Sequence, residues 1–449
     1  MTMARPATAG PQVTVPYPGP RARALIERMR AVEGAGPRTM GAGDPLVVED
    51  GRNATLRDPD GNTFVDLAGS FAAATLGHAH PDVTAAIRAQ AERVAHVASA
   101  AISEPRIAFE EALIDIAPPG LDRVLLGLSG ADANDTAVRL ARSLTGRRDV
   151  LAFSGGYFGR SSGVVGLNGK HVHRARTGRD ADAHFLPYPD PTRWPSAAGE
   201  DPARAALALA RHALEDPASG VGPVAAVVVE PVQGNGGIVI PPDGFLQGLR
   251  DLCDRTGALL IFDEIQAGFG RTGRMWAGEH WGVVPDLMTV GKGVGGGLAL
   301  SAVVGRAGAM AHWPAGTHTS TFLGNAINLA AGAAAIGVMR RDRLWERSAS
   351  LGAATLASLH ADLAGAPQTG EARGLGLCIG IPIVRRDGSG DPDADRAAGI
   401  KRAAFDRGVV VALAGHAEHV IKVTPPLTIE QDVLAASVRI LVDAILGDA

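Results

Sequence analysis

The sequence between about residues 82 and 340 alternates short apolar runs with longer segments of helical length. Six of the apolar runs have the length of strands, at residues 123–128, 150–153, 224–229, 258–262, 287–290 and 299–304. Each run is apolar on both faces, which is typical of strands in a sheet that helices cover on both sides. The alternation predicts an α/β core with a mainly parallel central sheet.

The segments that flank this core have a mixed pattern. Residues 1–65 combine an arm rich in proline, glycine and arginine with a short amphipathic stretch, and residues 341–449 mix helical and strand-like stretches. We therefore expect a large α/β domain over residues 66–340 and a smaller α+β domain, which the N-terminal arm and the C-terminal segment form together. Residues 187–202 contain five prolines and are expected to be a surface insertion.

Composition excludes several classes of protein. With 46% hydrophobic residues and a mean hydropathy of +0.09, the 449-residue chain can bury a large core and is not a disordered protein. No apolar run reaches the roughly 18 residues that cross a bilayer, and no secretory signal opens the chain, so we expect a cytoplasmic protein that does not bind membranes. A net charge of −4 provides no overall attraction to nucleic acid.

Lysine is rare in this chain. The lysines are Lys170, Lys292, Lys401 and Lys422, four of 43 lysine and arginine residues, which leaves 39 arginines. A genome that favours arginine codons is the simplest cause. A lysine in such a chain still merits inspection, because a lysine amine forms imines with carbonyl compounds and a guanidinium does not. Lys170 and Lys401 are expected to lie on the surface.

Polar and glycine residues follow the predicted strands. Because ligands bind beyond the carboxyl ends of strands in open α/β sheets, we expect these segments to meet in one crevice. They are residues 129–131, 155–157, 230–233, 263–266 and 291–292. Glycines, acids, an aromatic residue and a lysine would thus line the same site.

Lys292 lies between an apolar strand and a glycine-rich loop rather than among polar neighbours. Partial burial lowers the pKa of a lysine and supplies the neutral amine that reacts with an aldehyde. The alternative is a loop lysine that pairs with a carboxylate. Gly291, Gly293 and Gly296 also match the dinucleotide fingerprint, but a strand follows them where the fingerprint requires a helix, so dinucleotide binding is disfavoured.

Asp263 ends an apolar strand and needs a cationic partner, because burying a lone carboxylate costs several kcal/mol. A pyridinium nitrogen is one such partner and Arg271 is the alternative. Ser129 and Asp132 match a capping box at the start of a helix, whose free N–H groups suit a phosphate or mark an ordinary cap. The His78-Ala-His80 motif is expected to be a structural turn, and no metal site is expected.

Together these residues resemble the class-III aminotransferases, pyridoxal-phosphate enzymes of the fold-type-I architecture. The most specific match is LIFDEIQAGFGRTG at residues 260–273, followed by Pro285-Asp-Leu and Gly291-Lys-Gly. Supporting blocks lie at residues 76–81, 129–130, 156–157, 230–233, 320–325 and 373–377. The opening PGPRA at residues 18–22 is similar to 4-aminobutyrate aminotransferases within the family.

The resemblance implies pyridoxal 5'-phosphate as cofactor and a role for each matched residue. Lys292 would bind the cofactor covalently and then move a proton, while Asp263 would pair with the ring nitrogen. Gln266 would hydrogen-bond near the ring hydroxyl, and Tyr157 would stack on the ring. The phosphate would be bound by Gly130 and Ala131, and by Thr321 of a partner subunit in a homodimer with shared active sites.

Two positions depart from the family pattern. Phe158 stands where the family commonly has histidine, and Lys422 stands where aminobutyrate-type enzymes have an arginine. That arginine clamps the α-carboxylate of one substrate and pairs with the acid at Glu230 when the other binds. A lysine replaces its planar fork by a point charge and weakens bidentate recognition. Lys422 would either do the same work less well or mark a site for a bulkier or cationic amine.

The resemblance implies an aminotransferase that moves an amino group between a primary, omega-type amine and a 2-oxo acid. One alternative is an amino-sugar aminotransferase of the aminoglycoside type, which the departures at Lys422 and Phe158 favour. Another is a pyridoxal-phosphate epimerase or aminomutase, which would use Lys292 in the same way. A non-catalytic nucleotide-binding module is disfavoured, because Lys292 and Asp263 would then have no role.

Overall fold

A seven-stranded sheet forms the centre of the computed structural model, which describes residues 10–37, 43–175, 182–194 and 201–447. Its strands, in spatial order, are β4 (Arg123–Gly127), β10 (Ser301–Gly305), β9 (Leu287–Val290), β8 (Leu259–Asp263), β7 (Val224–Val229), β5 (Asp149–Phe153) and β6 (Ala183–Leu186). Neighbours from β6 to β9 are parallel, and β10 is antiparallel to both of its neighbours. The predicted mainly parallel sheet is confirmed. The short edge strand β6, which contains His184, was not predicted.

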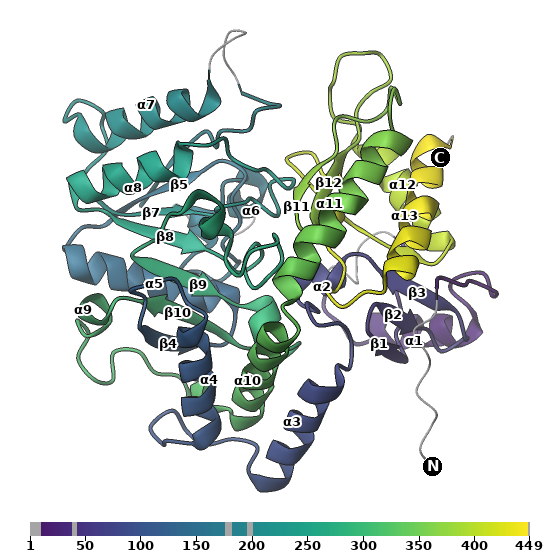
Figure 1. Ribbon diagram of the computed structural model, residues 1–449, viewed down its shortest axis with the longest axis horizontal. Helices are drawn as coiled ribbons and strands as arrows, with labels where there is room; N and C mark the ends of the chain where they lie inside the picture. The colour runs from purple at the N-terminus through teal and green to yellow at the C-terminus, as the bar shows by residue number, and fades with distance from the viewer. Residues whose placement is uncertain (1–9, 38–42, 176–181, 195–200, 448–449) are drawn as a thin grey trace.

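Helices cover both faces of this sheet (Figure 1). On one face, α5 (Gly130–Thr145) buries its apolar side against alternate strand residues such as Val150 and Val228. On the other face, α7 (Pro202–Glu215) and α8 (Phe245–Thr256) pack on the intervening residues, among them Leu151. The two-sided burial explains why the strands are apolar throughout.

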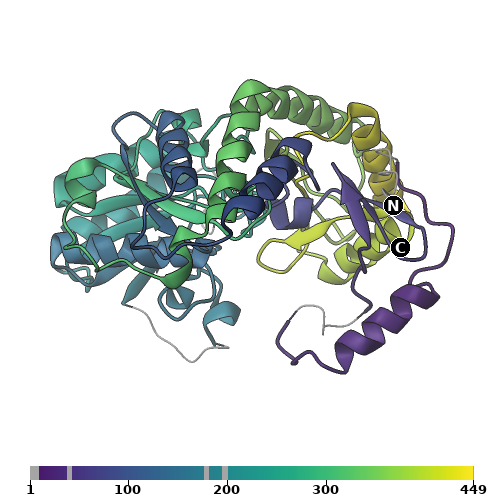
Figure 2. The same cartoon turned by 90° about the horizontal axis from the view of Figure 1, so that it is seen from below.

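Two smaller sheets lie beside this core. One joins β1 (Asp50–Arg52), β2 (Thr55–Arg57) and β3 (Thr63–Asp66) to β13 (Val409–Val410), which pairs with β3 in parallel. The other has the order β11 (Arg373–Leu375), β12 (Cys378–Pro382), β15 (Val420–Val423) and β14 (Ala412–Ala414). The N-terminal strands therefore lie beside the C-terminal elements, as Figures 1 and 2 show.

The remaining helices connect and cover these sheets (Figure 2). They are α1 (Pro20–Arg30), α3 (Pro81–Arg93), α4 (Glu104–Asp115), α10 (Ala326–Arg341), α11 (Leu344–Asp362), α12 (Ala394–Asp406) and α13 (Gln431–Leu446). Short helical turns are α2 (Gly69–Ala72), α6 (His171–Ala175), α9 (Ala307–Met310), η2 (Val165–Leu167), η3 (Ala277–Trp281), η4 (Lys292–Gly295) and η5 (Thr321–Gly324). None of the described helices is long and apolar enough to cross a membrane.

The surface prediction for Lys170 is wrong, and the one for residues 187–202 holds only in part, since residues 191–193 are exposed and residues 188–190 are buried. Lys170 is buried, because its loop packs against the hairpin between β14 and β15; its Nζ donates to Gly415 O at 2.6 Å and lies 3.8 Å from a Glu418 carboxylate oxygen. Within the predicted insertion, Tyr188 is buried and its hydroxyl donates to Glu230 O. Residues 195–200 of that insertion lie outside the described residues. Lys401, by contrast, is exposed on α12 as expected.

Candidate active site

Asp263 is the last residue of β8, and its carboxylate is held from two sides. Oδ1 accepts a hydrogen bond from the Ile265 N–H at 2.9 Å, and Oδ2 accepts one from Asn134 Nδ2 at 2.8 Å. Burial raises the pKa of this carboxyl group, although both hydrogen bonds and the charge of Lys292 oppose the shift. The carboxylate is therefore fixed in place and short of positive charge.

Asn134 is a site residue that the sequence reasoning missed. It sits on the buried face of α5, where its Oδ1 accepts a hydrogen bond from Thr289 Oγ1 of β9 at 2.8 Å. One side chain thus joins α5, β8 and β9. The available signal was a polar residue among the buried alanines of an amphipathic helix.

The other candidates around Asp263 have different partners. The guanidinium of Arg271, the alternative partner, donates instead to the carbonyl oxygens of Leu377 and Pro425. Glu264 turns away, because its carboxylate accepts the N–H groups of Ala277 and Gly278 at 2.9 and 2.8 Å. Burial raises the pKa of Glu264 to about 7. Only Asp263 of these two neighbouring acids faces the site.

Lys292 begins η4 directly after β9 and has a left-handed backbone with φ of 47°. Burial lowers the pKa of its amine, while the charges of Asp263 and Glu230 oppose the shift. Glycine follows at position 293 because a Cβ there would lie 2.3 Å from Thr75 Oγ1. The loop leads into the antiparallel strand β10, so its glycines serve a turn between two strands and not a dinucleotide site.

Glu230 follows β7 and is bound on both carboxylate oxygens. Oε1 accepts the Tyr157 N–H and Oε2 accepts the Gly234 N–H, each at 2.9 Å. Burial, with the charge of Asp263, raises the pKa of Glu230 to about 7, and the two hydrogen bonds and Lys292 lower it. Glu230 therefore holds the loop that carries Tyr157, and neither of its oxygens lacks a partner.

Gln266 lies near Gly234, on the loop after β8. A Cβ at position 234 would lie 2.4 Å from the Gln266 amide carbon, so glycine is needed for this approach. The amide nitrogen Nε2 of Gln266 is buried without a hydrogen-bond partner among the described residues. Because buried donors are normally satisfied, this nitrogen points to a ligand acceptor.

The first turn of α5 supplies the expected anion-binding end. Ser129 Oγ accepts the Asp132 N–H at 3.2 Å, as predicted, whereas the Asp132 side chain accepts the Leu128 N–H rather than closing the box on Ser129. Gly130 and Ala131 are partly exposed at this end. Their N–H groups lie where a helix favours a phosphate.

Lys422 is on β15, opposite Gly380 of β12 and Ala412 of β14. Its side chain is only 4% exposed, and its amine has no hydrogen bond or ion pair within the described part of the chain. Burial, followed by the charge of Lys292, lowers the pKa of Lys422 to about 8. Cys378 lies on the same face of β12 as Gly380, two residues away.

Two further predicted residues lie elsewhere. Phe158 is buried in the hydrophobic core next to Val164 and Leu167, so it does not extend the site and gives the amino-sugar alternative no support. Glycine at position 156 leaves room for the Phe158 ring, because a Cβ there would lie 2.9 Å from it. Thr321 begins η5 and is exposed.

The segment between β3 and α3 passes beside the loop of Lys292 and the end of the Lys422 strand. A Cβ at Gly69 would lie 2.3 Å from Thr424 O, two residues beyond Lys422. Residues 69–72 all have left-handed φ angles, from 48° to 64°, a conformation that costs non-glycine residues about 1–2 kcal/mol each. Asp66 Oδ2 holds this turn by accepting the Ser70 N–H at 2.8 Å and lying 3.0 Å from His78 Nε2.

Both histidines of the His78-Ala-His80 motif have partners in the fold, and His78 Nε2 lies 3.0 Å from Asp66 Oδ2. The His80 ring accepts the Asp82 N–H at the start of α3. No group of three histidine, cysteine or acidic side chains suitable for a metal occurs among the described residues.

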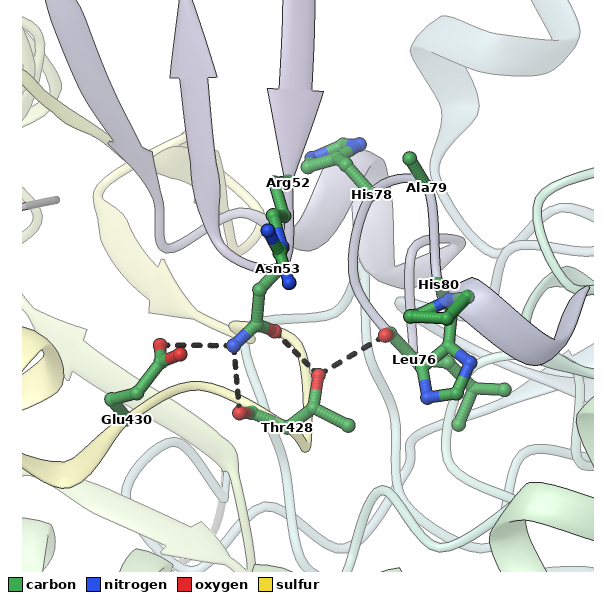
Figure 3. Close-up of a pocket in the computed structure, with 9 residues that line it drawn as sticks. Arg52, Asn53, Leu76, His78, Ala79, His80, Thr428 and Glu430 are labelled. Carbon is green, nitrogen blue, oxygen red and sulfur yellow. Dashed lines mark hydrogen bonds between the residues drawn. The ribbon is translucent and has the colours of Figure 1, made fainter. Parts of the chain in front are cut away.

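A cavity of about 400 Å³ opens beside these histidines (Figure 3). Asn53 Nδ2 donates there to Thr428 O and to a Glu430 carboxylate oxygen, both at 2.9 Å. None of the residues predicted for the site lines this cavity.

The Lys292 site fits pyridoxal phosphate. It combines an amine of lowered pKa, a buried carboxylate that is short of positive charge, a helix N-terminus, and the unpartnered Gln266 amide. An aldehyde, a pyridinium nitrogen, a phosphate and a ring hydroxyl would satisfy these four groups in turn. The fold and the site together define a pyridoxal-phosphate-dependent enzyme of fold type I.

The chain belongs to the class-III aminotransferase family, because the model of that family, "Aminotransferase class-III", matches residues 39–445. It is 36% identical over 403 residues to the 2-aminoadipate transaminase of Pseudomonas putida, covering 88% of this chain and 95% of that protein. It is 34% identical over 445 residues to the alanine/serine racemase of Pyrococcus horikoshii, covering 97% and 92%.

A solved structure agrees with this assignment. The (S)-enantioselective omega-transaminase of Thermomicrobium roseum superposes with a TM-score of 0.86 at 27% identity, over 95% of this chain and 99% of that one.

Proposed function

We propose that this aminotransferase takes the amino group from a primary amine whose nitrogen is not adjacent to a carboxylate and gives it to a 2-oxo acid. The observation that carries the proposal is Lys292, an amine of lowered pKa beside two buried carboxylates. The family assignment supports amino transfer. The likeness to an omega-transaminase supports an amine donor of the omega type.

The residues around Lys292 would hold the cofactor in distinct ways. The bound cofactor supplies a reactive aldehyde and an electron-withdrawing ring. Asp263, held by Asn134 and Ile265, would keep negative charge against the ring nitrogen, and Gln266 Nε2 would donate near the ring hydroxyl. Gly130 and Ala131 would bind the phosphate, and Tyr157 would cover the ring.

Lys292 Nζ would move the proton between the substrate carbon and the cofactor. Its burial favours the neutral amine that proton abstraction requires. Glu230 would orient Tyr157 through the Tyr157 N–H, and Lys422 would meet the carboxylate of the 2-oxo acid. No other lysine among the described residues faces this site.

Replacing Lys292 by alanine tests the assignment. The change removes the proton carrier, so we expect turnover to fall about a thousandfold or more, the range of a lost general base together with a lost covalent anchor. Borohydride reduction of the wild-type holoenzyme should fix a pyridoxyl group on Lys292, which peptide mass spectrometry would detect. Lys401→Ala is the matched surface control. A Lys292→Ala variant with unchanged turnover would refute the proposal.

We also propose a homodimer in which Thr321 of each subunit completes the phosphate site of the other. Thr321 is exposed, and it is followed by Phe322, which is 56% exposed. Ile102 is 84% exposed and comes three residues after Ser99, whose Oγ lies 3.1 Å from Thr319 Oγ1. Exposed apolar residues of this kind favour a subunit interface.

Subunit complementation tests this shared site. Thr321→Glu places a negative charge at the phosphate, so the variant should lose cofactor and activity. Co-expression with Lys292→Ala chains should restore activity, because mixed dimers contain one intact site. A monomer in solution, or mixed dimers without activity, would contradict the proposal.

An epimerase or racemase is a second candidate, since one relative is an alanine/serine racemase. The same Lys292 would serve that reaction. Acceptor dependence separates the two: without a 2-oxo acid an aminotransferase stops after the first half-reaction, whereas a racemase continues and keeps the nitrogen on its substrate.

The division of the chain remains a proposal as well. We propose that residues 66–340 form the cofactor-binding domain, and that residues 1–65 and 341–449 form the smaller domain, which the pairing of β3 with β13 supports.

A cytoplasmic location is supported by the free thiols of Cys253 and Cys378.

A further inference from the structure

Lys422 is a buried amine without a hydrogen bond or ion pair in the described part of the chain, and the charge of a second amine, Lys292, acts on it. An unpaired buried ammonium is costly, so such a group is either neutral or waits for an anion. An arginine at this position would keep its charge at any working pH, but a lysine does not have to.

The charge of Glu230 raises the pKa of Lys422, but no hydrogen bond or ion pair joins the Lys422 amine to any of the described residues. From the loop after β7, Glu230 has both oxygens committed to backbone N–H groups. From the loop after β8, Arg271 adds positive charge, and its guanidinium is fixed on the carbonyl oxygens of Leu377 and Pro425. From β12, Cys378 is a thiol whose pKa burial raises, so it stays neutral.

The remaining neighbours of Lys422 provide no negative charge. From η4, Lys292 contributes the second amine, and from β14 the residue opposite Lys422 is Ala412, which carries no charge. The proposed reaction brings two different substrates to this place in turn. The 2-oxo acid carries an α-carboxylate and the omega-type amine does not.

We propose that Lys422 serves both substrates by gaining and losing one proton, so that it binds the α-carboxylate of the 2-oxo acid as an ammonium and accommodates the amine donor, which lacks an α-carboxylate, as a neutral amine. The proposal rests on the proposed function for the identity of the two substrates. The proton comes from solvent when the acid binds and returns to solvent when the amino acid product leaves. No side chain has to move between two partners.

Proton uptake on carboxylate binding is the direct test. The probe is glutarate, an unreactive dicarboxylate, titrated calorimetrically into the holoenzyme in two buffers of different ionisation enthalpy. A free pKa of about 8 for Lys422 predicts uptake of most of one proton per site at pH 9 and almost none at pH 6.5. Glutarate affinity should fall about tenfold from pH 7 to pH 9.

Lys422→Arg isolates this residue from Lys292, which both enzymes share. The variant keeps the positive charge, so the extra proton uptake and the tenfold affinity change should disappear. Lys401→Arg, the same substitution on the surface, should behave as wild type. Lys422→Met serves as a second variant, in which glutarate binding at pH 7 should weaken about tenfold or more.

The amine half-reaction gives the complementary readout. With butylamine as donor, the rate of the cofactor absorbance change should be about tenfold lower in Lys422→Arg than in wild type at pH 9. The two enzymes should differ less at pH 7, where Lys422 is charged in both.

The proposed amino transfer and the proposed proton exchange of Lys422 would fail in different measurements. If no amine reacts but glutarate binding takes up a proton that Lys422→Arg abolishes, the proposed function fails and the role of Lys422 stands. If both half-reactions proceed and wild type and Lys422→Arg show the same proton uptake, the proton exchange is overturned.

Discussion

The two ends of the active site differ in how their charged groups are held. At the Asp263 end, both carboxylate oxygens accept hydrogen bonds, and Asn134 is itself fixed by Thr289. At the Lys422 end, the buried amine has no hydrogen bond or ion pair among the described residues. The protein holds the Asp263 carboxylate in place and does not hold the Lys422 amine.

This difference matches what each end must bind. A cofactor is the same in every turnover, so a preorganised carboxylate loses nothing by being rigid. The substrates alternate, and a group that serves both has to change either its position or its charge. The contrast lies in the charged groups: the carboxylate that would meet the constant cofactor is held by protein donors, and the amine that would meet the alternating substrates is not.

Asp263→Asn should have the largest effect of the changes that test this contrast. The substitution removes the negative charge opposite the ring nitrogen but keeps the side-chain shape, and we expect kcat to fall about a hundredfold or more. Because this end does not meet the varying part of the substrate, the loss should be the same for every amine and oxo acid. A loss that depended strongly on the substrate would break the comparison. Glutarate proton uptake should be retained.

A smaller effect distinguishes Lys422 from the other buried lysine. Lys170→Met leaves the Gly415 carbonyl without its donor and removes the pairing with Glu418, so the free energy of unfolding should fall by about 1–3 kcal/mol. Lys422→Met removes an unpaired buried charge and should raise it by about 1 kcal/mol at pH 7. Urea unfolding of both holoenzymes measures these opposite signs, and equal losses would argue that Lys422 is paired.

The pH dependence of the free energy of unfolding tests the state of Lys422 further. The folded pKa of Lys422, about 8, is below that of an unfolded lysine, so the unfolded chain binds more protons between these values. Stability should therefore rise with pH from about 8 upward in wild type. The rise should be smaller in Lys422→Met, while Lys170→Met should keep it.

Much of the site could be predicted because it follows the ends of strands. Asp263 is the last residue of β8 and Lys292 comes two residues after the end of β9, and a parallel sheet brings such positions to one edge. Asn134 could not be found in this way, since it acts from inside a helix. Glu264 and Phe158 lie in loops, and packing decided their directions: the Glu264 carboxylate accepts the Ala277 and Gly278 N–H groups, and the Phe158 ring lies in the core.

The four lysines show most clearly which properties follow from the sequence and which need the tertiary structure. The sequence determined the sheet, the strand ends and the two lysines of interest, because apolar periodicity and local motifs are properties of neighbouring residues. Only the tertiary structure decided that Lys170 is buried against the β14–β15 hairpin, and that Glu230 is committed to Tyr157 and Gly234. It also decided that Lys422 has no hydrogen bond or ion pair with any residue that the structure describes. Burial and partnership depend on segments hundreds of residues apart, and a charge is costly or useful according to what those segments place around it.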